Sequence, residues 1–218
     1  MSVQFSRLDA VGIGATLAAL AVAALSYPHL PETIAIHWNA SGTADNYASK
    51  AGGLGLFVGL VAGLSLLHRF GPALDPLSRS VRSTRGYDAF VALVLAFLVS
   101  VEVLVVAWNL DLVPVVLGSL LCPPFAVLSY AIGLVVERVD RNAVVGVRTP
   151  WTLASDAVWD ATHERAAPAF KLAAPLTLPG VAFAGEVAVA FAVGPMLLAA
   201  TYATGYSFVT YRRLDQPG

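Results

Sequence analysis

Charged residues are scarce in this chain, and their scarcity excludes a soluble protein of ordinary composition. Only 12% of the 218 residues are Asp, Glu, Lys or Arg, whereas 57% are hydrophobic. Soluble domains carry about 25% charged residues. The composition therefore predicts an all-α integral membrane protein, organised as one polytopic membrane domain over residues 1–218, whose first partner is the lipid bilayer.

The sequence also lacks the patterns of several chemistries. Cys122 is the only cysteine, so no disulfide can form within the chain. There is no Gly-rich phosphate loop, no cysteine pair, and no Ser, His and acid set that stands out from chance. We therefore expect no enzyme, no cofactor, no metal site and no direct contact with nucleic acid.

Six hydrophobic runs are long enough, or nearly so, to cross a bilayer. The predicted transmembrane helices cover residues 10–27, 52–67, 88–108, 112–136, 169–185 and 187–209. Arg7 precedes the first run, so a secretory signal peptide is the competing interpretation there. Pro123 and Pro124 should kink or break the fourth span. Lys171 and two prolines interrupt the fifth span.

Basic residues fall on one side of this predicted topology. The chain has 13 Lys and Arg residues, and all except Lys50 lie in segments that share a side with the two termini. Because basic residues accumulate in cytoplasmic segments, we expect both termini in the cytoplasm and the protein in the cell membrane. Residues 28–51 then form an extracytoplasmic loop, and residues 137–168 form a cytoplasmic loop.

Two features inside the predicted spans point to special roles. Gly55, Gly59 and Gly63 recur at four-residue spacing, which predicts a helix-packing face, although a merely glycine-rich helix is the alternative. Glu102 lies well inside the third span, where a carboxylate is costly. It is either an intramembrane polar site or an acid that reaches water along its helix or in a cavity.

Residues 146–163, GVRTPWTLASDAVWDATH, form a polar insert in the cytoplasmic loop. Since a proline favours extended geometry in the preceding residue, we expect a turn at residues 149–152 rather than the start of a helix. Ser155 or Asp156 can cap a helix over residues 157–167, which Pro168 should end. A surface for a partner or for signalling is predicted from Arg148, Thr149, Pro150, Trp151, Thr152, Trp159 and His163. The alternative is a membrane-surface loop with Trp and Arg at headgroup depth.

The extracytoplasmic loop carries a second candidate surface. Residues 33–38 alternate in a strand-like manner, and residues 39–42 read as a turn. We expect a ligand or toxin surface formed by His37, Trp38, Asn39 and Asp45. A structural cap, with Asn39 and Asp45 bonding their own turn, is the alternative. The spacing of the possible ligands matches no standard metal site.

Two patterns carry a family resemblance. Arg141-Asn142, the run GVRTPWTLAS from Gly146, Trp159 and Thr162-His163 resemble the signature of the SdpI-like family. A second pattern resembles the amino-terminal module of uncharacterised function found in many members: Tyr27-Pro28, Pro31, Ile34, His37-Trp38-Asn39, Gly42, Asp45 and Lys50.

The resemblance implies a protein that protects its cell from a secreted antimicrobial peptide or protein toxin. It further implies, as in some members, signalling by a transcriptional repressor held at the membrane. On this interpretation the extracytoplasmic loop meets the toxin and the polar insert meets the cytoplasmic repressor.

Other classes of function stay open on the sequence alone. A small transporter or proton-coupled carrier could use Glu102 and the break at Pro123 and Pro124, although no paired repeats support it. A membrane-embedded enzyme would rest on Arg148, Asp160 and His163. Neither alternative has a sequence signature of its own.

Overall fold

The protein is a bundle of long helices with a two-stranded sheet at one end. The computed structural model describes residues 6–39, 41–74, 85–113, 117–142 and 145–214. The long helices are α1 (Arg7–Ser26), α2 (Lys50–Leu74), α3 (Arg85–Asn109), α4 (Leu117–Val136), α6 (Asp156–Thr177) and α7 (Gly185–Leu214). The shorter elements are β1 (Thr33–Trp38), β2 (Ala44–Ser49), α5 (Pro150–Ala154) and the 3₁₀ helix η2 (Leu178–Ala182).

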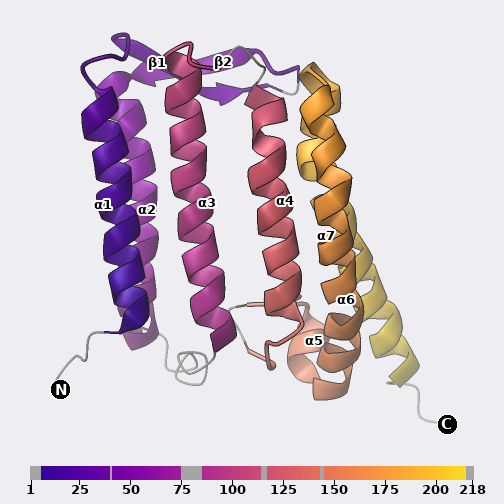
Figure 1. Cartoon of the computed structure of the whole chain (residues 1–218). Coiled ribbons are helices and arrows are strands. Elements are labelled where there is room, and N and C mark those ends of the chain that lie inside the picture. Colours follow the sequence, from indigo (N-terminus) through magenta and orange to yellow (C-terminus); the bar gives the residue numbers. More distant parts are fainter. Residues whose placement is uncertain (1–5, 40, 75–84, 114–116, 143–144, 215–218) are drawn as a thin grey trace.

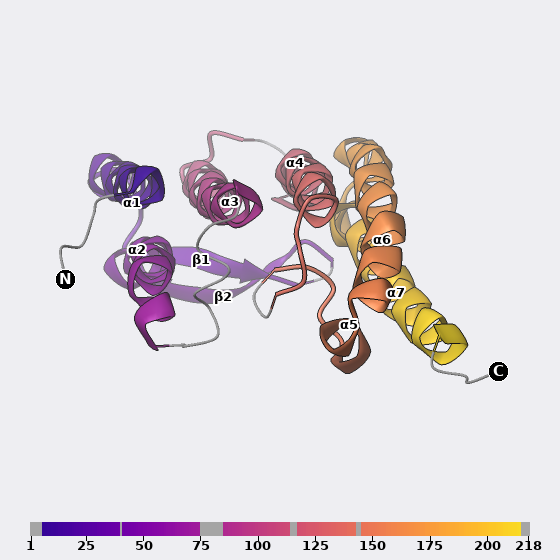
Figure 2. The ribbon, with the colours of Figure 1, turned by 90° about the horizontal axis from the view of Figure 1, so that it is seen from below.

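The long helices run side by side between two distinct ends (Figure 1). The β1–β2 hairpin lies across one end, which we call the hairpin end, and α5 lies at the other, which we call the signature end. Seen from below, α1, α3 and α4 stand in a row, α2 lies to one side of it, and α6 and α7 close one end of the row (Figure 2). α1 begins and α7 ends at the signature end.

Membrane-spanning character is evident in five of the described helices, which are long and apolar enough to cross a bilayer: α1, α2, α3, α4 and α7. The fifth predicted span differs from the structure. α6 begins at Asp156 instead of residue 169, ends at Thr177 and passes into η2. Its polar first half, DAVWDATHER, lowers its apolar character, although the helix runs the full height beside α7 (Figure 1).

Prolines interrupt the helices less than the sequence predicts. The prediction that Pro168 ends a helix is wrong, because Pro168 lies inside α6. Pro123 and Pro124 likewise lie inside an unbroken α4. A proline in a helix interior removes one backbone hydrogen bond. In α6 that loss is offset by packing, since Ala166, Phe170 and their neighbours are buried in a cluster with α4 and α7.

The glycines that allow close helix contact are not the predicted ones. A Cβ added at Gly55, Gly59 or Gly63 would meet nothing within 4 Å, so the predicted packing face is wrong within this chain. The three glycines lie on the exposed side of α2. A Cβ at Gly133 of α4, in contrast, would lie 2.7 Å from the Lys171 side chain and 2.8 Å from the Ala167 carbonyl oxygen of α6. Gly133 therefore permits the close approach of α4 and α6.

The hairpin is antiparallel and is attached to α3. Ile34 pairs with Ala48 and Ala35 with Tyr47, with an irregularity in register beyond Ala35. The side-chain oxygen of Asn109, the last residue of α3, accepts the Ala35 N–H at 2.8 Å, and its amide nitrogen donates to the Ala35 carbonyl at 3.0 Å. The strand-like stretch predicted for residues 33–38 is confirmed as β1.

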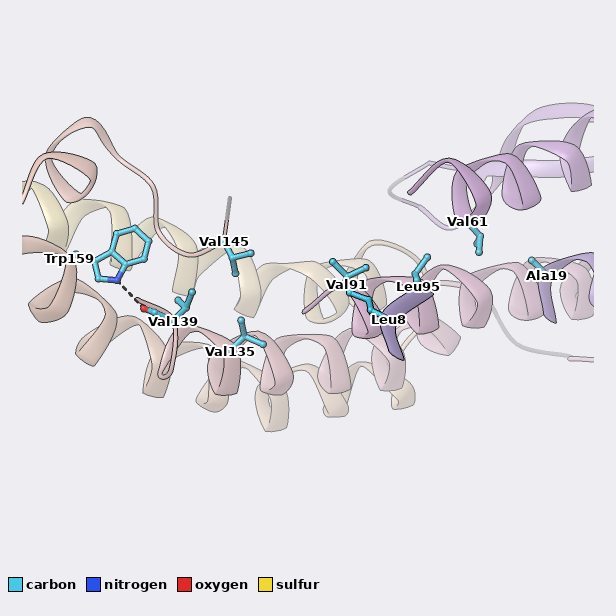
Figure 3. Close-up of a cluster of buried hydrophobic side chains, with 9 residues drawn as sticks. All are labelled: Leu8, Ala19, Val61, Val91, Leu95, Val135, Val139, Val145 and Trp159. Atoms are coloured by element: carbon cyan, nitrogen blue, oxygen red, sulfur yellow. Dashed lines mark hydrogen bonds between the residues drawn. The ribbon is translucent and has the colours of Figure 1, made fainter. Parts of the chain in front are cut away.

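The largest apolar cluster links the helices near the signature end. It contains buried side chains from α1 to α4, Val139 and Val145 from the segment that follows α4, and Trp159 of α6. Figure 3 shows its nine residues: Leu8, Ala19, Val61, Val91, Leu95, Val135, Val139, Val145 and Trp159. Because one member belongs to the predicted signature, that signature is joined to the core of the bundle.

Candidate functional site at the signature end

The short helix α5 starts at the proline that was expected to prevent a helix. Pro150 occupies the first turn, where a missing N–H carries no cost, so the predicted turn at residues 149–152 is wrong. Thr149 caps the helix in extended geometry, with its hydroxyl accepting the Thr152 N–H at 3.3 Å. The Thr152 hydroxyl in turn accepts the Thr149 N–H at 2.8 Å. The two threonines therefore define the start of α5.

Trp151 fastens α5 to α7. Its indole N–H donates to the Ser207 hydroxyl at 2.7 Å. Its ring lies 5.3 Å from the Phe208 ring and 6.1 Å from the Tyr211 ring. Ser207 is fully buried and Trp151 is half-buried, so this hydrogen bond is partly shielded from solvent. Sequence reasoning did not single out Ser207, and its only signal was a small polar residue within an apolar run.

A stacked pair of rings holds the preceding loop against α6. The Trp159 and His163 rings lie 3.9 Å apart at an interplanar angle of 18°. The Trp159 indole donates to the Val139 carbonyl at 3.0 Å, a bond drawn in Figure 3. His163 Nε2 accepts the Val147 N–H at 3.1 Å, and its Nδ1 lies 2.8 Å from the Trp159 carbonyl oxygen. These partners fit a neutral imidazole that donates from Nδ1.

Gly146 is required where the loop passes over these rings. Its φ of +114° is a conformation that L side chains rarely adopt. A Cβ at this position would lie 2.5 Å from His163 Nε2 and 3.0 Å from the Trp159 ring. The burial of His163 lowers the pKa of its imidazole, which favours the neutral form needed by the Val147 hydrogen bond.

Two further signature residues organise the loop. The Arg141 guanidinium contacts the Asp156 carboxylate and donates to the Leu153 carbonyl, both at 2.5 Å. Asn142 accepts the Val145 N–H at 2.8 Å. The Arg141 contacts tie the segment that follows α4 to α5 and to the start of α6. Asp156 takes part in this tie, while Ser155 is the residue that caps α6.

Most of the predicted partner surface is buried and serves the fold. Thr149, Thr152, Trp159 and His163 are all buried, so their assignment to an exposed surface is wrong. Trp151 is half-buried against α7, whereas Arg148 and Pro150 are exposed. We call the following set the signature clamp, in which Gly146 and Trp151 are half-buried and the other members are buried: Gly146, Thr149, Trp151, Thr152, Trp159, His163 and Ser207. Around it, Arg148 and Pro150 face outward.

The hairpin end holds the second predicted surface, and it divides in two. His37 and Asp45 are exposed and bond each other at 2.5 Å, between Nδ1 and Oδ1. Trp38 turns inward, with its ring 5.0 Å from the Trp108 ring, edge to face. Asn39 holds the turn by accepting the Thr43 N–H at 3.0 Å. Of the four residues, His37 and Asp45 therefore remain available to a partner.

Glu102 is fully buried in α3. Neither carboxyl oxygen has a hydrogen-bond partner in the described part of the chain. It shares a helical face with Leu95, Val106 and Asn109, the face that meets α1, α2 and β1. The described residues hold no group of three or more His, Cys, Asp or Glu side chains that could bind a metal.

Comparison with known proteins matches both ends of the fold. Residues 14–62, which include the hairpin, match a domain of unknown function, DUF1648. Residues 138–207, which include the signature clamp, match the SdpI/YfhL protein family. No curated protein and no solved structure matches the chain. The order and position of the two matches agree with the two sequence patterns and with the predicted SdpI-like resemblance: the chain carries a DUF1648 domain ahead of an SdpI/YfhL-family region.

Proposed function

We propose that this membrane protein protects the cell that carries it against a secreted peptide or protein toxin. The hairpin end would face outward and meet the toxin. The signature end would face the cytoplasm and hold a repressor protein at the membrane. Among the described Lys and Arg residues, only Lys50 belongs to the hairpin end, which supports this orientation through the positive-inside rule.

The observation that carries the proposal is that α7 contacts the functional region at each end. A Cβ on Gly185, the first residue of α7, would lie 3.2 Å from the Ser41 carbonyl oxygen in the turn of the hairpin. Ser207 of the same helix receives the Trp151 indole hydrogen bond of the signature clamp. The two positions are separated by about 33 Å along one continuous helix. A shift of the hairpin on toxin binding would reach α5 through this helix.

The cytoplasmic partner would bind the exposed residues beside the clamp. Arg148 is exposed beside the clamp, and its planar guanidinium suits bidentate contact with a carboxylate of a partner. Pro150 and Leu153 of α5 are exposed next to it and offer an apolar rim. The charge, the fork geometry and the adjacent apolar surface together fit a protein partner.

The test expresses the chain in a strain that the toxin-containing culture filtrate kills. Protection by the wild-type chain supports the immunity role, and its absence at normal membrane level overturns it. For signalling, Arg148→Lys is compared with Arg165→Lys, a matched change at another exposed arginine. Arg148→Lys should release the repressor from the membrane fraction and leave the amount of the chain unchanged. Equal retention of the repressor by the two variants would refute a role for the Arg148 fork.

A further inference from the structure

The two edges of the hairpin differ in whether the rest of the molecule forms hydrogen bonds with them. The edge of β1 is occupied by Asn109, whose side-chain amide bonds both the N–H and the C=O of Ala35. That pair of bonds is the one a neighbouring strand would supply. Asn109 therefore caps the β1 edge as a single residue in place of a strand.

The same bonds fix the direction of the backbone groups in β2. In an antiparallel strand the N–H and C=O of one residue point to the same side. Because those of Ala35 point to Asn109, away from β2, Ala35 and Tyr47 form a pair without mutual hydrogen bonds. The N–H and C=O of Tyr47 consequently point away from β1, along the outer edge of β2.

This outer edge is open. Within the described ranges, no residue bonds the Tyr47 N–H or C=O. Asp45, Asn46 and Tyr47 are all exposed, Tyr47 by 57%. From below, β1 lies toward α3 and β2 lies on the opposite side, where no described helix covers its middle (Figure 2). Proteins usually block such an edge, since it is a template for another strand.

We propose that the free edge of β2 binds an extended segment of the toxin as an additional strand, a proposal that rests on the proposed immunity function. Main-chain groups in a row select an extended backbone whatever its side chains. The Asp45 carboxylate beside the edge favours a segment with a basic side chain at that point. The DUF1648 domain thereby supplies the part of the protein that recognises the toxin.

A proline at residue 47 tests the proposal because it removes the outward N–H. Proline is tolerated in an edge strand where its nitrogen faces outward. Tyr47→Ala loses the same side chain but keeps the N–H, so it is the matched variant. Both variants are expressed in the strain that the filtrate kills. The amount of filtrate that halves growth should be about tenfold lower for cells with Tyr47→Pro than for cells with Tyr47→Ala, as expected for the loss of one hydrogen bond and a clash at the edge. Equal protection by the two variants at equal membrane levels would overturn strand addition.

Hydrogen exchange of the wild-type chain gives a test that does not depend on the proline variant folding. The probe is the peptide fraction of the filtrate that kills the sensitive strain. On addition of this fraction, hydrogen exchange at the Tyr47 amide should slow. If the chain protects cells against the fraction but exchange at this amide is unchanged, the proposal is refuted. If the wild-type chain gives no protection, the immunity function itself fails, and the toxin is eliminated as the occupant.

A second copy of the chain is the competing occupant of this edge. If a second copy occupies the edge, oxidation of the Asn46→Cys variant in membranes without toxin gives a disulfide-linked dimer. If the edge binds the toxin instead, the variant stays monomeric. A dimer in the absence of toxin would overturn the proposal. Native Cys122 is fully buried and does not interfere with this measurement.

Discussion

At the scale of residues, the signature clamp depends on the protonation state of one imidazole. His163 Nε2 accepts the Val147 N–H, so a proton on Nε2 would place two donors face to face. Burial lowers the pKa of His163 below its ordinary value of about 6.5. The unfolded chain then binds more protons than the folded chain between the two pKa values, so stability rises with pH in that window.

The resulting prediction is that the clamp loosens in mild acid. The stabilisation from neutral His163 should be fully present above about pH 6.5 and be lost as the pH falls from there toward the lowered folded pKa. Thermal unfolding of the detergent-solubilised protein at pH 5.5 and 7.5 measures it. His163→Gln should be less stable at pH 7.5 but less sensitive to pH. A wild-type protein whose unfolding temperature is the same at both pH values would contradict the assignment.

Glu102 is predicted to lower the stability of the bundle. The Glu102 carboxyl group is fully buried and has no partner among the described residues, so the free energy cost of removing it from water is not offset by a hydrogen bond. Glu102→Met should therefore raise the free energy of unfolding by about 1–3 kcal/mol. Denaturant or thermal unfolding in detergent measures the change, with Val103→Met on the exposed side of α3 as the control. A lower unfolding temperature for Glu102→Met would mean that the carboxyl group has a partner in the core.

At the scale of elements, close helix packing depends on Gly133 and not on the glycines of α2. Gly133→Ala should lower the unfolding temperature, because its Cβ would meet the Ala167 carbonyl of α6 at 2.8 Å. Gly59→Ala is the matched change at an open position and should be neutral or slightly stabilising, since alanine favours helix. Equal effects of the two changes would show that α4 and α6 can separate at no cost.

The helices also show what the sequence can and cannot predict. The apolar runs, the strand at residues 33–38 and the helix in the polar insert follow from local patterns, and the family followed from two spaced motifs. The end expected at Pro168 was wrong because tertiary packing against α4 and α7 overrides a local break. Burial of Trp159 and His163 was equally hidden, because the Val139 carbonyl and the Val147 N–H are backbone groups that no side-chain pattern reveals.

At the scale of the whole molecule, the orientation of the bundle stays a prediction that labelling can test. A cysteine at Ser41 in the hairpin turn should react with an impermeant thiol reagent in intact cells. A cysteine at Glu164, exposed at the signature end, should react only after the cells are opened. Because Cys122 is fully buried, the native background should be low. The opposite labelling pattern would place the signature end outside.

The capping of β1 by Asn109 has a consequence for how this protein can diverge. Asn109 attaches the hairpin to α3 through the backbone N–H and C=O of Ala35. This attachment therefore does not depend on the side chains of β2, which can be substituted while the attachment is retained. Hairpins with altered β2 sequences should therefore be accepted by the same helices, so this end of the molecule can change its surface while the bundle is kept.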